Sequence, residues 1–322
     1  MIDQKKVEEI VSLPDGVDFQ ENVDPVKLYY LLIGKPEERN PIAYAEIFEE
    51  AAKHPKASEW MRFACIGEGL NGRRRAKGAD HADIEGRFVS LSGDAGKLPE
   101  SVAKQSLLAG NWYNVGILRR NLRRYSESAD AQRTSSSHYG LAGNVVRHLM
   151  GLFVAEVEEV SASFASSDDD LIRKRIRAMV SARNYVLDSL EEYPVWMQNN
   201  ACVHISFAVA MTEFRGMKGV ASKDYATDFR AARGSSMAHW AKAFAVYEDY
   251  RRGRYEKVTK AVPVDLPSSS LDNANLMVQI TVAYAERKLQ HRERAEGRLR
   301  AVANHTGPNG GIPIAVATAS LQ

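Results

Sequence analysis

The chain has 322 residues, of which 44% are hydrophobic and 26% are charged, and its formal net charge is +2. This composition excludes a disordered polypeptide, and no apolar run approaches the roughly 18–20 residues that a helix needs to span a bilayer. The N-terminal segment lacks the long apolar region of a secretory signal, so we expect a cytoplasmic protein without membrane association. Cys65 and Cys202 have neither metal-ligand nor disulfide-framework spacing and are expected to be buried and reduced.

Charge is unevenly spread along the chain. Residues 1–60 hold 13 acidic and 7 basic residues, a net charge of −6, so the remainder carries +8. Much of this excess lies in clusters of arginine. Such an asymmetry favours an anionic partner.

The N-terminal region, residues 1–98, begins with predicted helices and ends in a predicted loop. Residues 67–98 are dense in glycine and charge and predict a long Gly/Arg-rich loop with at most one short helix. This loop begins with GEGLNG, which matches a dinucleotide-binding motif literally but follows a helix instead of a strand, so a loop is the preferred interpretation. Apolar periodicity and proline start signals predict the helices at 5–11, 26–34, 42–54 and 60–66.

From Ser101 onward helical periodicity persists, and no stretch alternates apolar and polar residues long enough to predict a sheet. The fold class is therefore expected to be all-α. Asp168 and the two aspartates after it are candidate helix caps. Residues 304–322 form an apolar C-terminal tail suited to cover the last helix or to dock on a neighbour. We expect helices at 101–123, 125–135, 140–163, 169–191, 195–215, 224–233, 236–251, 254–261, 271–290 and 291–303.

Residues 112–131 carry the clearest pattern of a helical hairpin. Trp112, Val115 and Gly116 share one face of its first helix, and Tyr125 and Ser128 begin the second. A glycine inside a helix costs about 1 kcal/mol relative to alanine, so Gly116 is expected where a partner backbone comes very close. Ser128 is a small residue suited to the opposing surface.

These residues resemble a tetratricopeptide repeat, in which helix A carries W-x2-L-G and helix B begins Y-x-x-A. Ser128 stands in place of the usual alanine, and Arg119 where an apolar residue is usual. Weaker echoes occur at 251–258, at 275–302 and at Gly151, which follows Gly116 by 35 residues. The resemblance implies stacked antiparallel helical hairpins over residues 99–303, a tetratricopeptide-like α-solenoid with a concave surface. An irregular helical bundle with one fortuitous match is the alternative.

The resemblance implies a non-enzymatic scaffold or adaptor that binds another protein or a peptide on its concave face. Histidines and carboxylates show no catalytic or metal-ligand spacing, so no catalytic residue, metal or cofactor is expected. By resemblance, the binding surface takes side chains from helix A, and an aromatic and arginine surface is typical of binding hot spots. In the matched repeat these residues are Tyr113, Asn114, Ile117, Arg120 and Asn121.

Nucleic-acid binding, to RNA or DNA, is the alternative function. Stacked hairpins that brought the basic clusters together would form a phosphate-binding stripe, although ordinary solvated arginines are the competing interpretation. The cluster over 173–177 lies near a helix start, where cations oppose the helix dipole. The candidate phosphate-binding residues are Arg73, Arg74, Arg75, Arg123, Arg124, Arg173, Lys174 and Arg177.

Overall fold

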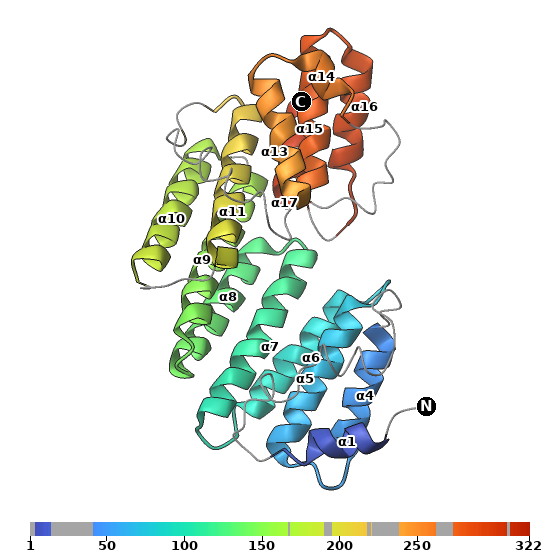
Figure 1. Cartoon of the computed structure of the whole chain (residues 1–322), viewed down its shortest axis with the longest axis vertical. Coiled ribbons are helices and arrows are strands. Elements are labelled where there is room, and N and C mark those ends of the chain that lie inside the picture. Colours follow the sequence, from blue (N-terminus) through green and yellow to red (C-terminus); the bar gives the residue numbers. More distant parts are fainter. Residues whose placement is uncertain are drawn as a thin grey trace. The chain divides into compact units, whose positions relative to one another are not determined.

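The computed structural model describes residues 4–13, 41–166, 168–189, 195–217, 220, 238–261, 273–307 and 310–322. Within these ranges every regular element is an α-helix, and fourteen helices are present (Figure 1). The predicted all-α fold class is therefore confirmed. None of these described helices is both long and apolar enough to cross a membrane. The helices predicted at 26–34 and 224–233 lie outside the described residues.

The chain divides into two compact units. The first unit comprises Met1–Leu122 and Glu127–Leu152, and the second comprises Arg123–Ser126 and Phe153–Gln322. In both units, helices that follow one another in the sequence pack on one another as antiparallel hairpins.

The first unit is built around α5. Helix α1 (Gln4–Val11) packs on α4 (Pro41–Lys53), α4 on α5 (Glu59–Arg75), α5 on α6 (His81–Ala95) and α6 on α7 (Val102–Asn121) (Figure 1). Helix α5 also contacts α7 directly. Hydrogen bonds join α8 (Tyr125–Leu141) to α7 and α9 (Val145–Ser166) to α8, from Ser135 Oγ to Ala109 O at 2.8 Å and from Ser136 Oγ to His148 O at 2.7 Å.

The second unit continues the same arrangement. Helix α10 (Asp169–Asp188) packs on α11 (Val195–Phe214), and α13 (Ala238–Arg251) packs on α14 (Tyr255–Thr259) and α15 (Asn273–Lys288). Helix α15 packs on α16 (Arg292–Ala303), and α16 packs on α17 (Gly311–Leu321). The predicted C-terminal tail thus forms a helix that covers α15 and α16 and buries Ile312 and Val316.

Local capping explains several of the helix starts. Asp168 Oδ1 accepts hydrogen bonds from the amides of Asp170 and Leu171, both at 3.0 Å, so the predicted cap of α10 is confirmed. Ser58 and Ser101 cap α5 and α7 in the same way. Each cap satisfies amides that the first turn of a helix leaves without a partner.

The loop predicted over residues 67–98 is wrong. Helix α5 continues through GEGLNG to Arg75, and α6 covers His81–Ala95. The glycines of this motif are buried, and a Cβ atom at Gly72 would lie 2.9 Å from both Pro41 O and Tyr44 Cδ1. Glycine lowers helix propensity, but here it lets the α4 backbone approach closely, and the packing that results outweighs propensity.

The close packing predicted at Gly116 and Ser128 is confirmed, but α8 meets Gly116 with side chains and not with its backbone. Ser128 Oγ donates a hydrogen bond to Gly116 O at 2.8 Å, and a Cβ atom at Gly116 would lie 2.9 Å from Gln132 Cδ. At Gly151 a Cβ atom would lie 2.7 Å from Ser136 Cβ, so the next hairpin repeats the contact of glycine with a small polar residue.

Turns with one left-handed residue recur in the second unit at a fixed interval. Gly216, Gly253 and Gln290 have φ values of 74°, 73° and 65°, and each follows the previous one by 37 residues. After each, the next amide donates to the carbonyl five residues back at 2.8–3.0 Å, which is the Schellman helix ending. This 37-residue repeat of turns cannot be recognised from the sequence, because Gln290 stands where the other two turns have glycine.

A buried ion pair joins α15 to α16. Arg298 Nε lies 3.1 Å from both carboxylate oxygens of Glu286, and its Nη1 donates to Gln279 Oε1 at 2.8 Å. The Arg298 and Glu286 side chains are only 5% and 1% exposed. Each group therefore depends on the other for its hydrogen bonds.

The glycine packing predicts opposite effects for two alanine substitutions. Gly72→Ala is expected to destabilise the protein by about 1–3 kcal/mol, because the methyl group must overpack against the α4 backbone. Gly86, in α6, is exposed with open space at its Cβ position, so Gly86→Ala should stabilise the protein by up to about 1 kcal/mol. Urea unfolding followed by circular dichroism measures both. An increase in the unfolding midpoint for Gly72→Ala would contradict the close-packing explanation.

The buried ion pair predicts a large single-residue effect. Arg298→Met is expected to destabilise the second unit by about 3–5 kcal/mol, since it leaves the Glu286 carboxylate buried without its partner. The double variant Arg298→Met with Glu286→Leu removes both charges and should recover much of that loss. Urea unfolding of the single and double variants tests this coupling, and equal stability of the two variants would show that there is none.

Candidate functional site

The side chains predicted to bind a partner lie along α7. Tyr113 is 44% exposed, whereas Ile117 and Arg120 are half-buried. Residues 113, 117 and 120 lie on one side of the helix because they are spaced by four and three positions. Asn114 Nδ2 donates a hydrogen bond to Gly110 O of its own helix at 3.0 Å. Asn121 is the last residue of α7 and is half-buried.

Helix α5 adds basic residues beside Tyr113 and Arg120. Burial lowers the pKa of the Arg74 guanidinium, and the charges of Arg75 and Arg120 lower it further. Tyr113 and Glu68 act in the opposite direction on the same pKa. Helices α5 and α7 contact each other, and the charges of Tyr113 and Arg120 on α7 act on Arg74 of α5.

A chain of hydrogen bonds orients the α5 side chains. Arg74 Nη2 donates to Asn71 Oδ1 at 2.9 Å, and Asn71 Nδ2 donates to Glu68 Oε2 at 3.3 Å. The Tyr44 hydroxyl donates to the same Glu68 oxygen at 2.6 Å, and the Arg75 guanidinium lies 4.8 Å from the centre of the Tyr44 ring. Such networks hold charged side chains in place.

We call this surface the α5–α7 face. It holds three arginines, one carboxylate and an exposed tyrosine. Its members are Glu68, Asn71, Arg74, Arg75, Tyr113, Ile117 and Arg120.

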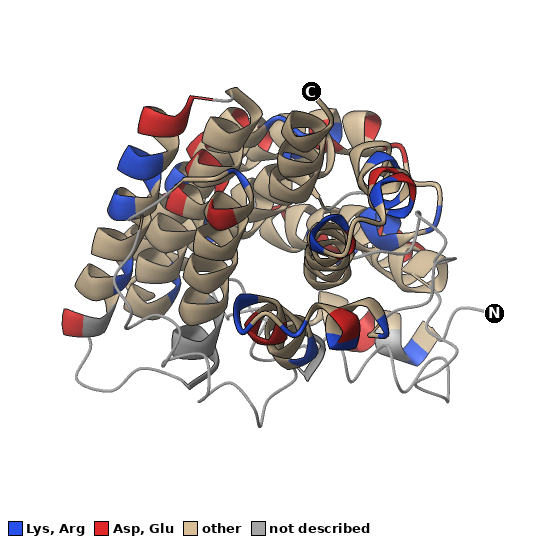
Figure 2. Cartoon of the chain, turned by 90° about the horizontal axis from the view of Figure 1, so that it is seen from above, with Lys and Arg blue, Asp and Glu red and all other residues tan. Residues whose placement is uncertain are grey.

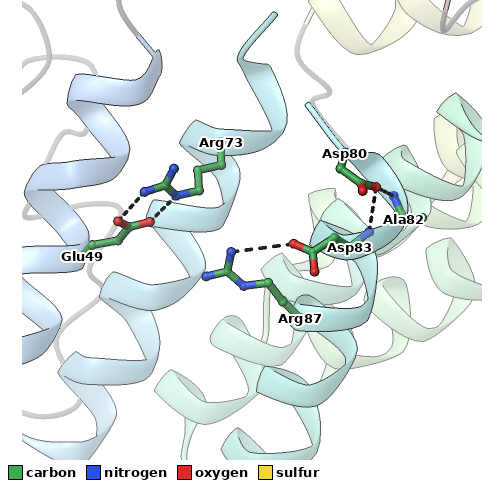
Figure 3. Close-up of polar contacts among 6 residues, drawn as sticks. All are labelled: Glu49, Arg73, Asp80, Ala82, Asp83 and Arg87. Atoms are coloured by element: carbon green, nitrogen blue, oxygen red, sulfur yellow. Dashed lines mark hydrogen bonds and ion pairs between the residues drawn. The ribbon is translucent and has the colours of Figure 1, made fainter. Parts of the chain in front are cut away.

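Arg73 points away from this face. Its Nε and Nη2 atoms bind the Glu49 carboxylate at 2.5 and 2.7 Å, as Figure 3 shows. The pair lines a groove of about 710 Å³ between α4, α5 and α6, which we call the α4–α6 groove. Its apolar lining includes Ile42, Ile66 and Ile84, and its charged lining consists of Glu49, Lys53, Arg73, Lys77, Asp80, Asp83 and Arg87.

The other candidate phosphate-binding residues belong to the second unit. Arg123 donates from Nη2 to His305 O, and Arg124 is exposed. Arg173, Lys174 and Arg177 lie in the first half of α10, whose first turn also carries acidic residues. Basic and acidic residues are interleaved along the helices of each unit (Figure 2). The eight residues are therefore divided between the units, and Arg73 is separated even from Arg74.

Three members of the polar network do not stand out in the sequence. Tyr44, Glu68 and Asn71 carry no local motif, and residues 68 and 71 fell inside the predicted loop. Once α5 is recognised as a helix, Glu68, Asn71 and Arg75 share one side by their spacing of three and four residues.

Within the described ranges, no group of three His, Cys, Asp or Glu residues could hold a metal ion. Searches against family models, curated proteins and solved structures found no match to this chain.

The Tyr44–Glu68 bond predicts a specific pH dependence. Burial and the Glu68 charge raise the pKa of Tyr44 above its usual value of 10.0, so the folded state keeps a proton that the unfolded chain loses. This contribution to stability is complete below about pH 10 and is lost as the pH rises further. Tyr44→Phe should cost about 1.5–3 kcal/mol near neutral pH and reduce the loss of stability above pH 10.

Urea unfolding of wild type and Tyr44→Phe across this alkaline range measures both effects. Burial and Glu213 also raise the pKa of Tyr247. Both proteins should therefore still lose some stability above pH 10. Identical alkaline slopes for the two proteins would contradict the role assigned to Tyr44.

Proposed function

We propose that this protein is a non-enzymatic scaffold that binds another protein or a peptide through the α5–α7 face. One observation carries the proposal: Tyr113, which is exposed, and Arg120 lie on one side of α7, and their charges act on Arg74 of the contacting helix α5. Tyrosine and arginine dominate binding hot spots because they combine apolar area with directional hydrogen bonds. A tetratricopeptide-like repeat over α7 and α8 is supported by the Gly116–Ser128 contact.

The charge of the face indicates an acidic partner segment. The charges of Arg75 and Arg120 act on Arg74, and the charge of Glu68 opposes them. Glu68 already accepts hydrogen bonds from Tyr44 and Asn71. A carboxylate from the partner would relieve the mutual repulsion of these guanidinium groups and could bind them in a bidentate manner. We therefore propose a peptide rich in aspartate or glutamate as the ligand class.

Nucleic-acid binding is the weaker alternative. Among the candidate phosphate-binding residues, Arg73 is engaged with Glu49 and Arg123 with a backbone carbonyl. Phosphate binding would also have to weaken steeply with salt, because each contact releases a counterion. Anisotropy titrations with labelled single-stranded RNA and double-stranded DNA at about 50 and 200 mM salt test this alternative.

The proposed surface predicts a selective loss of binding. Tyr113→Ala combined with Arg120→Gln should weaken binding of acidic peptides, selected from a displayed library by wild-type protein, by about tenfold or more. Tyr185→Ala with Arg62→Gln makes the same chemical changes at exposed positions outside the face and should leave affinity unchanged.

Isothermal titration calorimetry measures the affinities, and circular dichroism checks that both double variants are folded. Failure of the library to yield acidic peptides, or equal affinity of the two double variants, would contradict the assignment. Steeply salt-dependent binding of the oligonucleotides would favour the alternative.

A further inference from the structure

The α4–α6 groove lies on the opposite side of α5 from the proposed peptide surface. At about 100° per residue, Ile66 and Arg73 fall within roughly 20° of one another around the helix. Lys77 lies in the turn that follows α5. By the same geometry, Glu68, Asn71 and Arg75 lie roughly 140–180° from Ile66. Arg74 lies roughly 80° from Ile66 and does not line the groove, so the two surfaces use different side chains of α5.

Three isoleucines supply apolar lining to the groove. Ile42 on α4, Ile66 on α5 and Ile84 on α6 line it, and Ile42 remains 36% exposed. Ala52 of α4 and two residues of the turn between α5 and α6, Ala76 and Ala79, add to the apolar lining. Apolar surface inside a concave groove favours the apolar part of a ligand over water.

Cations converge on the Glu49 carboxylate at one wall of the groove. Its hydrogen bond with Arg73 lowers the pKa of Glu49 against the opposing effect of burial, and the charges of Arg73, Arg87 and Lys53 lower it further. Arg87 extends from α6 toward α5, as Figure 3 shows. Three basic residues from three helices thus act on a single acidic group.

The other carboxylates of the groove offset this charge only in part. Asp80 accepts hydrogen bonds from the amides of Ala82 and Asp83 at 3.0 and 3.1 Å, so it serves as the cap of α6. Asp83 lies 4.0 Å from Arg87, at the outer limit of an ion pair, and both side chains are about half exposed. Lys77, in the turn after α5, is exposed at the rim. Four basic and three acidic residues leave the lining with a positive charge.

We propose that the α4–α6 groove binds a small amphipathic anion, with a ring-sized apolar body on Ile42, Ile66 and Ile84 and a carboxylate or phosphate at Arg87 and Lys77. The volume of about 710 Å³ lies within the range of small-molecule sites, about 300–1,000 Å³. The Glu49–Arg73 pair fixes α4 against α5 and forms the polar wall. The anion binds beside this pair and takes the place of water around Arg87.

Calorimetric titration of the whole chain with four probes tests the site. 1-Naphthyl phosphate and 1-naphthoate combine a ring with an anion, inorganic phosphate supplies charge alone, and 1-naphthol supplies the ring alone. At least one of the two aromatic anions should bind more tightly than both inorganic phosphate and 1-naphthol. The stronger of the two identifies the charged group that the site prefers.

Two variants locate the binding. Arg87→Gln should weaken the binding of the preferred anion by about tenfold, which is the loss of affinity typical of one charge-assisted hydrogen bond. Arg62→Gln removes the same charge from an exposed position of α5 outside the lining and should have no effect. Circular dichroism confirms that both are folded. The proposal is overturned if neither aromatic anion binds, if 1-naphthol or inorganic phosphate binds as tightly, or if the two variants bind alike.

Discussion

The close approach of α4 to α5 is the contact on which the first unit depends. Gly69 and Gly72 present no side chain, so the α5 backbone meets Ala45 and Pro41 of α4 almost directly. Gly67 does the same toward Asn111 of α7. A central helix held this closely on two sides can place charged residues on its two remaining sides without loss of packing. Both proposed binding surfaces use α5 in this way.

Arginine has two distinct roles in this protein. Some arginines join helices from within, as Arg298 does with Glu286 and as Arg119 does with Glu85 at 2.7 Å. Arg119, which departs from the apolar residue expected at its position, thereby ties α7 to α6. Such residues stabilise specific helix pairs and add nothing to the charge offered to a partner. The excess of basic residues along the sequence is therefore a poor measure of binding surface.

Both proposed sites combine basic and apolar side chains, but one is an exposed surface and the other is a groove between helices. On the α5–α7 face, Tyr113 stands out from the surface and suits the broad contact of a peptide. In the α4–α6 groove, the ligand must enter between helices, so volume limits it to a small molecule. Because Arg73 and Arg74 are consecutive residues of α5 that face different surfaces, one turn of a single helix supplies cations to both.

The sequence by itself determined the all-α class, most helices and the Gly116–Ser128 contact, because apolar periodicity, caps and a mid-helix glycine are local signals. It could not identify the helices within residues 67–98, since the glycines there lower helix propensity and only packing against α4, α6 and α7 compensates. The sequence also could not predict that Arg74 lies near Arg120 or that Tyr44 contacts Glu68, because the residues of each pair come from different helices. Their proximity depends on how α5 is rotated between its neighbours, and tertiary packing alone decided that rotation.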